Sequence, residues 1–162
     1  MIDITTIGEI LIDLTQSGLT EQGIPRCDAN PGGAPANLAV AAARLGSKTA
    51  YIGRVGRDSF GDFLRRTLAD NDVDVSGMSD DPEQHTTLAV VSLDERGERS
   101  FSFYRDPSAD VNLSFEDVPA AQLEKTRVLH FGSVSLTAEP SRSATTKRPL
   151  SWWRSTANCV AS

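Results

Sequence analysis

Cysteine is nearly absent from this sequence. Its 162 residues contain only Cys27 and Cys159, so no disulfide framework and no Cys-x-x-Cys pair can form. No apolar run approaches the length of a membrane-spanning helix. The N-terminal residues also lack the basic segment and long apolar stretch of a signal peptide. We therefore expect a protein of the reducing cytoplasm that does not enter a membrane.

Positive charge is also scarce. The chain has 16 Lys and Arg against 22 Asp and Glu, a formal net charge of −6. Because nucleic acids and anionic membranes attract basic surfaces, this balance argues against both as partners. His85 and His130 lie far apart in the sequence without Cys or His neighbours, so we predict no metal site. The expected partner is a small molecule or another protein.

The charge is distributed unevenly along the chain. Residues 1–140 contain 12 bases and all 22 acids, a net charge of −10, whereas residues 141–162 contain four bases and no acid. Residues 146–162 also show neither a helical nor a strand period of apolar residues. Two interpretations are open for this tail: an ordinary basic segment, or a non-native segment from a frameshift or a cloning scar. We favour the second and place the domain at residues 1–145.

The remaining sequence alternates between strand and helix patterns. Apolar runs predict strands over residues 2–14, 24–29, 49–55, 86–93, 100–104 and 128–132, with a hairpin loop over 94–98. Helices are predicted over residues 36–45, over a stretch capped by Asp58 or Ser59, and over 116–123. The first helix is apolar almost all round, so we expect it to be buried. Such alternation predicts an α/β fold with helices beside a partly parallel sheet.

A glycine pair before the first predicted helix carries the clearest chemical signal. Gly32 and Gly33 have no Cβ, so a ligand could approach the backbone there. The N–H groups at the start of the helix and the amide of Asn37 would then face that ligand. Taken alone, this pattern is more often a turn followed by a helix cap.

The ordered segments of the chain resemble the ribokinase-like (PfkB) carbohydrate kinases, and among them fructokinase most. The glycine run at 32–37 resembles the first family signature, and residues 8–13, 51–61 and 130–140 resemble other family segments. The resemblance extends from residue 1 to about residue 145. It implies an α/β core with a small β lid, whose strands lie near residues 15–30 and 86–105.

The resemblance also implies ATP-dependent phosphorylation of a sugar hydroxyl. By position, the residues that would bind the sugar are Asp13, Gly32, Gly33, Asn37 and Arg105. Each has a simpler interpretation, since Asp13 could cap a strand end, the glycines could form a turn, and Arg105 could be a solvated charge. Phe101 and Phe103 could pack in the lid or stack on the sugar.

The catalytic part of the family's sequence is missing. In the family, a Gly-Ala-Gly-Asp segment carries the base and holds phosphate, and this sequence does not contain it. ATP and Mg²⁺ are therefore implied only by the family, and we assign no catalytic residue. Residues 56–61 have the spacing of a Walker loop, but Asp62 and Phe63 stand where Lys and Ser or Thr are needed.

Two hypotheses follow for the function. In the first, the chain is the sugar-binding part of a carbohydrate kinase, truncated before the nucleotide-binding half and inactive alone. In the second, it is a non-catalytic module that binds a sugar or forms a homodimer through its lid strands.

Overall fold

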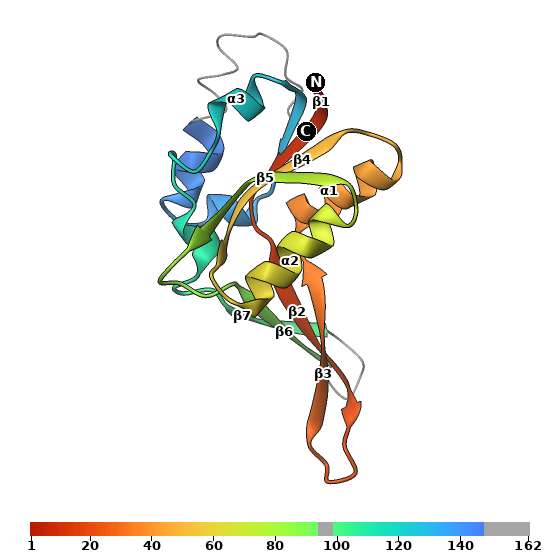
Figure 1. Ribbon diagram of the computed structural model, residues 1–162. Helices are drawn as coiled ribbons and strands as arrows, with labels where there is room; N and C mark the ends of the chain where they lie inside the picture. The colour runs from red at the N-terminus through yellow and green to blue at the C-terminus, as the bar shows by residue number, and fades with distance from the viewer. Residues whose placement is uncertain (94–98, 148–162) are drawn as a thin grey trace.

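The computed structural model describes residues 1–93 and 99–147, which form two four-stranded sheets (Figure 1). We call the first sheet and its helices the body and the second sheet the lid. The body sheet has the order β5-β4-β1-β8 and is parallel throughout. Its strands are β1 (Ile2–Ile7), β4 (Thr49–Gly56), β5 (Val73–Asp81) and β8 (Thr126–Phe131).

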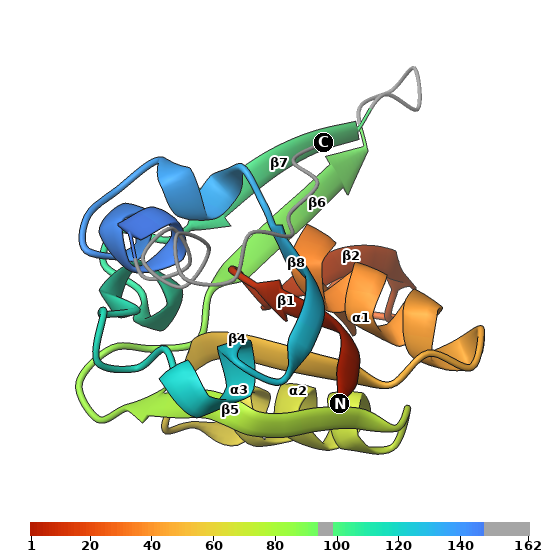
Figure 2. The ribbon, with the colours of Figure 1, turned by 90° about the horizontal axis from the view of Figure 1, so that it is seen from above.

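Helical segments lie on both faces of the body sheet (Figure 2). Helices α1 (Ala34–Arg44) and α2 (Ser59–Ala69) cover one face, and α3 (Ala120–Leu123) lies on the other. Successive residues of β4 point to opposite faces, as the pleat of a strand requires. Tyr51 packs in the core beneath α1 and α2, whereas Ile52 packs in the second core with Leu123. The near-continuous apolar pattern of β4 is therefore explained by burial on both sides.

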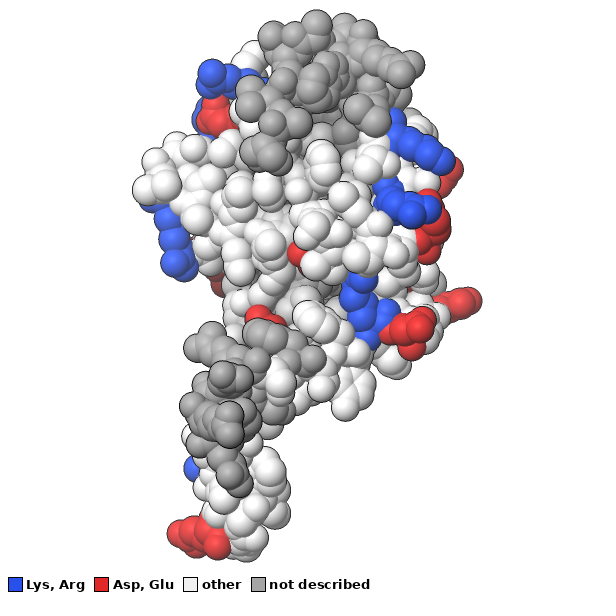
Figure 3. Space-filling model, turned by 180° about the vertical axis from the view of Figure 1, so that it is seen from behind, with Lys and Arg blue, Asp and Glu red and all other residues white. Residues whose placement is uncertain are grey.

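The lid sheet has the order β3-β2-β6-β7. Its strands are β2 (Leu11–Leu19), β3 (Pro25–Gly32), β6 (Leu88–Leu93) and β7 (Arg99–Tyr104). Strands β2 and β6 are parallel, and the two outer pairs are antiparallel. The far ends of β2 and β3 extend beyond β6 as an arm (Figure 1). The tip of this arm is acidic (Figure 3), and the turn between β2 and β3 contains Glu21.

One predicted strand, over residues 2–14, is in fact two strands in different sheets. The chain leaves the body at Gly8, which has φ +147, a value that few residues with a side chain adopt. The Tyr51 hydroxyl donates to the Gly8 carbonyl oxygen at 2.6 Å and helps to hold this break. The prediction was wrong because the apolar run continues from the body core into the base of the lid.

The first predicted helix forms, but it is not buried all round. It begins at Ala34, two residues before the predicted start, and only Pro35, Ala36 and Ala39 are buried. Ala41 is exposed, because the helix packs through a single face. Apolar composition therefore overestimated the burial of this alanine-rich helix.

Other predicted elements agree with the structure. Asp58 caps α2, since its Oδ1 accepts from the Gly61 N–H at 2.8 Å. The strands over 24–29, 49–55, 86–93, 100–104 and 128–132 and the helix near 116–123 are all present with shifted ends. Strand β5 was not predicted, because its sequence VDVSGMSDD mixes apolar and acidic residues without a clear run.

Parts of two predictions lie outside the described residues. These are the hairpin loop over 94–98 and residues 148–162 of the predicted tail. Residues 141–147 are helical, and Ala144 and Thr145 are buried against the body. Within the described ranges, no helix is both long and apolar enough to cross a membrane.

Candidate functional site

The lid joins the body at the carboxyl ends of the parallel strands. Strand β1 continues into β2 through residues 8–10, and β3 leads directly into α1 at Gly32 and Gly33. In open α/β sheets, ligands bind outside the carboxyl ends of the strands. This junction is therefore the candidate site.

Asp13 lies in β2, close to the junction. Burial raises the pKa of its carboxyl above the ordinary value. The carboxylate accepts no hydrogen bond from the described residues, so both oxygens are available to a ligand. A Cβ on Gly32 would lie 2.3 Å from Asp13 Oδ2, so a side chain at position 32 would displace the carboxylate. Glycine at this position keeps the carboxylate in place.

Gly33 forms the start of α1. Its φ of +106 favours glycine, and a Cβ there would lie 2.5 Å from the Glu9 carbonyl oxygen. No side chain caps this helix end, so N–H groups of its first turn remain without a side-chain partner. Asn37 lies one turn into the helix, is exposed, and donates its backbone N–H to the Gly33 oxygen at 2.9 Å. Asp13, Gly32, Gly33 and Asn37 thus lie along one continuous stretch of the junction.

A groove of about 290 Å³ opens between α1 and α2 beside this stretch. Gly32 and Asn37 lie along it, and Arg44 Nε donates to Asn71 Oδ1 at 2.9 Å at its other end. Asp13 is not part of the groove wall. Gly32 and Asn37 are therefore accessible from the groove between the two helices.

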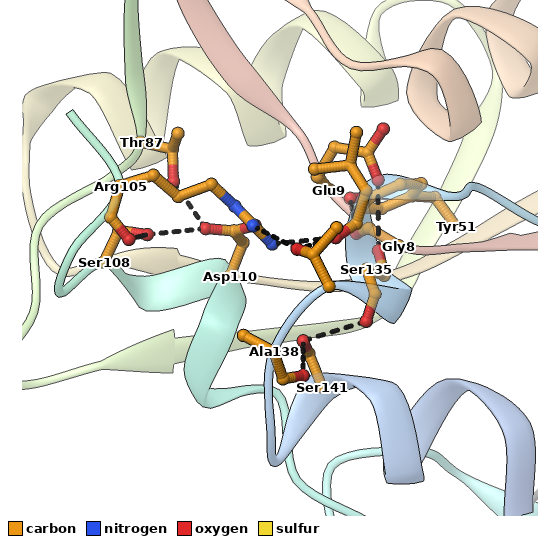
Figure 4. Close-up of polar contacts among 12 residues, drawn as sticks. Gly8, Glu9, Tyr51, Thr87, Arg105, Ser108, Asp110, Ser135, Ala138 and Ser141 are labelled. Atoms are coloured by element: carbon orange, nitrogen blue, oxygen red, sulfur yellow. Dashed lines mark hydrogen bonds and ion pairs between the residues drawn. The ribbon is translucent and has the colours of Figure 1, made fainter. Parts of the chain in front are cut away.

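Arg105 directly follows the end of β7 and belongs to a different network of polar contacts (Figure 4). Its Nε donates to Asp110 Oδ2 at 2.8 Å, and its other nitrogens donate to Thr137 Oγ1 at 2.9 Å and the Val134 oxygen at 3.3 Å. The Asp110 side chain is only 2% exposed. An arginine held by a buried carboxylate is largely neutralised. Arg105 also borders a second cavity of about 440 Å³, together with Phe103 and Thr137.

Asp110 was missed in the sequence. It lies in a short 3₁₀ turn, Ala109–Asn112, whose sequence has no apolar period. Its Oδ1 accepts from the hydroxyls of Thr87 and Ser108, so one buried carboxylate joins the start of β6 to the end of β7. No local pattern predicts the contact with Thr87, because the two residues are 23 positions apart in the sequence.

Glu9 was also missed, although it lies in a segment that resembles the kinase family. It is 3% exposed, and its Oε2 accepts from the Ser135 hydroxyl at 3.0 Å (Figure 4). Burial, and then the negative charges of Glu9 and Asp110, raise the pKa of Tyr51 well above its ordinary value. Glu9 therefore connects the bend between β1 and β2 to the segment after β8.

The register of the lid strands places four residues side by side in one row across the sheet. Asp13 is opposite Asn30 on β3 and Ala89 on β6, and Ala89 is opposite Phe103 on β7. Directly opposed residues point to the same face of a sheet. Asp13, Asn30, Ala89 and Phe103 therefore share one face of the lid, which also places Phe103 near the cavity bordered by Arg105.

The loop over residues 56–61 is not a phosphate site. The Gly56 N–H donates to Thr86 Oγ1 at 3.0 Å. The Asp58 carboxylate accepts the N–H and the hydroxyl of Thr86, both at 2.8 Å. The Gly56 N–H is therefore not available to a phosphate, and the negative charge of the Asp58 carboxylate would repel one. The loop fixes the connection between the body and β6, and its residues do not fit a nucleotide phosphate.

Comparison with known proteins gives a consistent result. The sequence pattern of the pfkB family carbohydrate kinases matches residues 1–152. A probable chloroplastic fructokinase-6 from Arabidopsis thaliana is 47% identical over 143 residues, which is 87% of this chain and 37% of the relative. The chain spans less than half the length of this curated relative.

Two solved structures have the same fold as this chain. Fructokinase from Xylella fastidiosa with bound ATP has a TM-score of 0.84 and 36% identity, covering 93% of this chain and 49% of its own. Fructokinase from Vibrio cholerae in a fructose, ADP and calcium ion bound form has a TM-score of 0.79 and 38% identity, covering 98% and 49%. The ribokinase-like fold predicted from the sequence is thereby confirmed.

Proposed function

Because this chain belongs to the pfkB family of carbohydrate kinases, we propose that it forms the sugar-binding part of a fructokinase. The reaction of such an enzyme transfers the γ-phosphoryl group of ATP to a sugar hydroxyl, with Mg²⁺ neutralising the phosphates. The similar Vibrio cholerae structure holds fructose and ADP, which supports a ketose as the substrate. A reducing cytoplasm is the proposed compartment.

The observation that carries this proposal is the carboxylate of Asp13 beside Gly32, which has no hydrogen-bond partner among the described residues. A half-buried carboxylate in this state is costly to keep and is well suited to accept hydrogen bonds from two neighbouring hydroxyls. Charge-assisted bonds of this kind contribute roughly 1.5–3 kcal/mol each. Because Gly32 has no side chain, the sugar can approach this carboxylate closely.

The helix start completes the proposed sugar site. Gly33 allows the backbone to turn with a positive φ, and the exposed amide of Asn37 can donate to one hydroxyl or accept from another. Together these groups bind and orient a sugar without changing it chemically. Orientation matters because phosphoryl transfer depends on an in-line approach of the hydroxyl. For Arg105 we propose a role at the edge of the site, next to the cavity it shares with Phe103.

Isothermal titration tests the proposal directly. We expect the chain to bind D-fructose and the Asp13→Asn variant to bind it at least tenfold more weakly, since one charge-assisted acceptor is lost. Asp62→Asn makes the same change in charge on the exposed surface of α2 and should bind like the wild type. Equal binding by the wild type and Asp13→Asn would contradict the proposed site.

Turnover is a separate question. The sequence contains no Gly-Ala-Gly-Asp segment, and the loop over 56–61 does not fit phosphate. We therefore expect a coupled assay with fructose, ribose and ATP to detect no phosphorylation by this chain alone. Robust turnover would show that other residues supply the base and the phosphate contacts.

A second candidate function is pairing of two copies through the lid. Four large apolar side chains among the described residues of the lid region are exposed: Leu19 at 58%, Ile24 at 60%, Phe103 at 55% and Tyr104 at 66%. Strands β3 and β7 are the two edges of that sheet, and exposed edges favour pairing with another chain. Sedimentation velocity should then show a dimer that weakens in the Ile24→Ser variant, and a monomer at all concentrations would exclude this function.

A further inference from the structure

Asn30 is a polar residue of the lid that has no function assigned so far. It is directly opposite Asp13 in the antiparallel ladder between β2 and β3, so the two side chains share one face. Neighbouring strands lie roughly 5 Å apart. One monosaccharide can therefore contact Asn30 and Asp13 together, whereas Phe103 lies two strands beyond Asp13, about 10 Å away.

The amide of Asn30 is available to a ligand. Asn30 is exposed, and its Nδ2 donates to the Asp28 carbonyl oxygen at the long distance of 3.4 Å. Its Oδ1 accepts no hydrogen bond from the described residues. Asp28, the next residue on this face of β3, differs from Asn30 because its Oδ1 accepts from the Ser17 hydroxyl at 3.1 Å. Among these neighbours, Asn30 and Asp13 thus have the least satisfied polar groups.

We propose that Asn30 determines which sugar the site accepts, an inference that rests on the proposed function. Asp13, when ionised, can only accept hydrogen bonds, so it binds hydroxyls as donors. The amide of Asn30 can both donate and accept. It therefore binds the hydroxyl next to those held by Asp13 and distinguishes sugars by the presence and orientation of that hydroxyl. In the proposed site, Asn37 and the glycine loop belong to the helix start that follows β3.

The test is a titration of the full chain with D-fructose and a set of its monodeoxy analogues. On the wild type, we expect one analogue to bind about three- to tenfold more weakly than fructose, the range for one neutral hydrogen bond. Asn30→Ala should bind fructose more weakly by the same factor and should no longer distinguish that analogue. Cys27→Ala, on the other face of the same strand, should match the wild type throughout.

The outcomes separate this inference from the function on which it rests. If the wild type binds neither fructose nor any analogue, the proposed function fails, and the role of Asn30 fails with it. If the wild type binds fructose and Asn30→Ala keeps both its affinity and its preference among the analogues, only the role of Asn30 is overturned. An equal loss for all sugars, without a change in preference, would also overturn it, because Asn30 would then not select between them.

Discussion

The body and the lid each contain four strands, but different forces hold them. In β4 of the body, every residue except Arg54 is buried, whereas in β3 of the lid only Gly32 is buried. The body is therefore stabilised by removal of apolar surface from water, and the outer lid mainly by the hydrogen bonds of its ladder. The proposed sugar-binding residues lie where this exposed sheet joins the body. We therefore expect stability to depend mainly on the body, and sugar recognition on the lid and its junction with the body.

Truncation of a core leucine should produce the largest effect. Leu64 of α2 is fully buried in the core between α1, α2 and the body sheet. Leu64→Ala should lower the free energy of unfolding by about 3 kcal/mol, through lost apolar contact and the cavity left behind. Leu19→Ala on the arm, where the side chain is 58% exposed, should change it by less than about 0.5 kcal/mol. Urea unfolding measures the free energy of unfolding of both variants. Similar decreases for Leu64→Ala and Leu19→Ala would contradict the expected difference between the body and the arm.

The next effect depends on pH and lies where the body leads into the lid. Burial alone would raise the pKa of Asp81, but hydrogen bonds from Asn112 and the backbone of Gln84 and Glu83, with the charge of Arg54, lower it to about 2. A lowered carboxyl pKa stabilises the fold above the unfolded value of 3.8, and this stabilisation is lost as pH falls toward 2.

The Asp81→Asn variant isolates this contribution. At pH 6 it should be less stable than the wild type by about 2 kcal/mol, and the difference should shrink as pH falls through 4 and 3. Unfolding by urea at each pH gives the comparison. A difference that stays constant with pH would show that the charge of Asp81 is not the source of its effect.

A substitution at Tyr51 tests what stabilises the break in the chain between the body and the lid. Its buried hydroxyl donates to the Gly8 oxygen at 2.6 Å, where β1 ends and the chain turns toward β2. Tyr51→Phe removes this bond and should cost about 1 kcal/mol of stability. Sugar affinity should fall by less than about twofold if the glycine loop keeps its place without the bond. If Tyr51→Phe reduces the free energy of sugar binding by more than it reduces the free energy of unfolding, Tyr51 positions the site.

Local pattern located most strands of both the body and the lid, and it failed where the apolar pattern does not follow the fold. Buried strands such as β4 have continuous apolar runs, and α2 has a capping aspartate before an apolar stripe, so local pattern locates them. Strand β5 was missed because polar residues interrupt its apolar ones, and the break at Gly8 was missed because the apolar run does not stop there.

Within the candidate site, sequence order was enough to group four of the predicted residues, but it did not reveal the partners of Arg105 and Glu9. Asp13, Gly32, Gly33 and Asn37 become neighbours through one strand pair and the helix start that follows it. Arg105 contacts Thr137, 32 positions away, and Glu9 contacts Ser135, 126 positions away, so these pairs join distant segments. Only the assembled fold brings those partners together, so no local pattern could have predicted them.

The Asp13→Asn variant should have the smallest effect on stability. It also tests most sharply whether the body provides stability and the lid provides recognition. Burial raises the pKa of Asp13, so its charged form is disfavoured in the folded state, and stability should increase slightly as pH falls through that raised pKa. Asp13→Asn should therefore be as stable as the wild type at pH 7, or more stable by ~0.3 kcal/mol, because the group is partly solvated. The same variant should lose fructose binding. A residue whose removal stabilises the fold and abolishes binding is kept for the ligand, whereas a loss of stability would instead assign Asp13 to the structure of the lid.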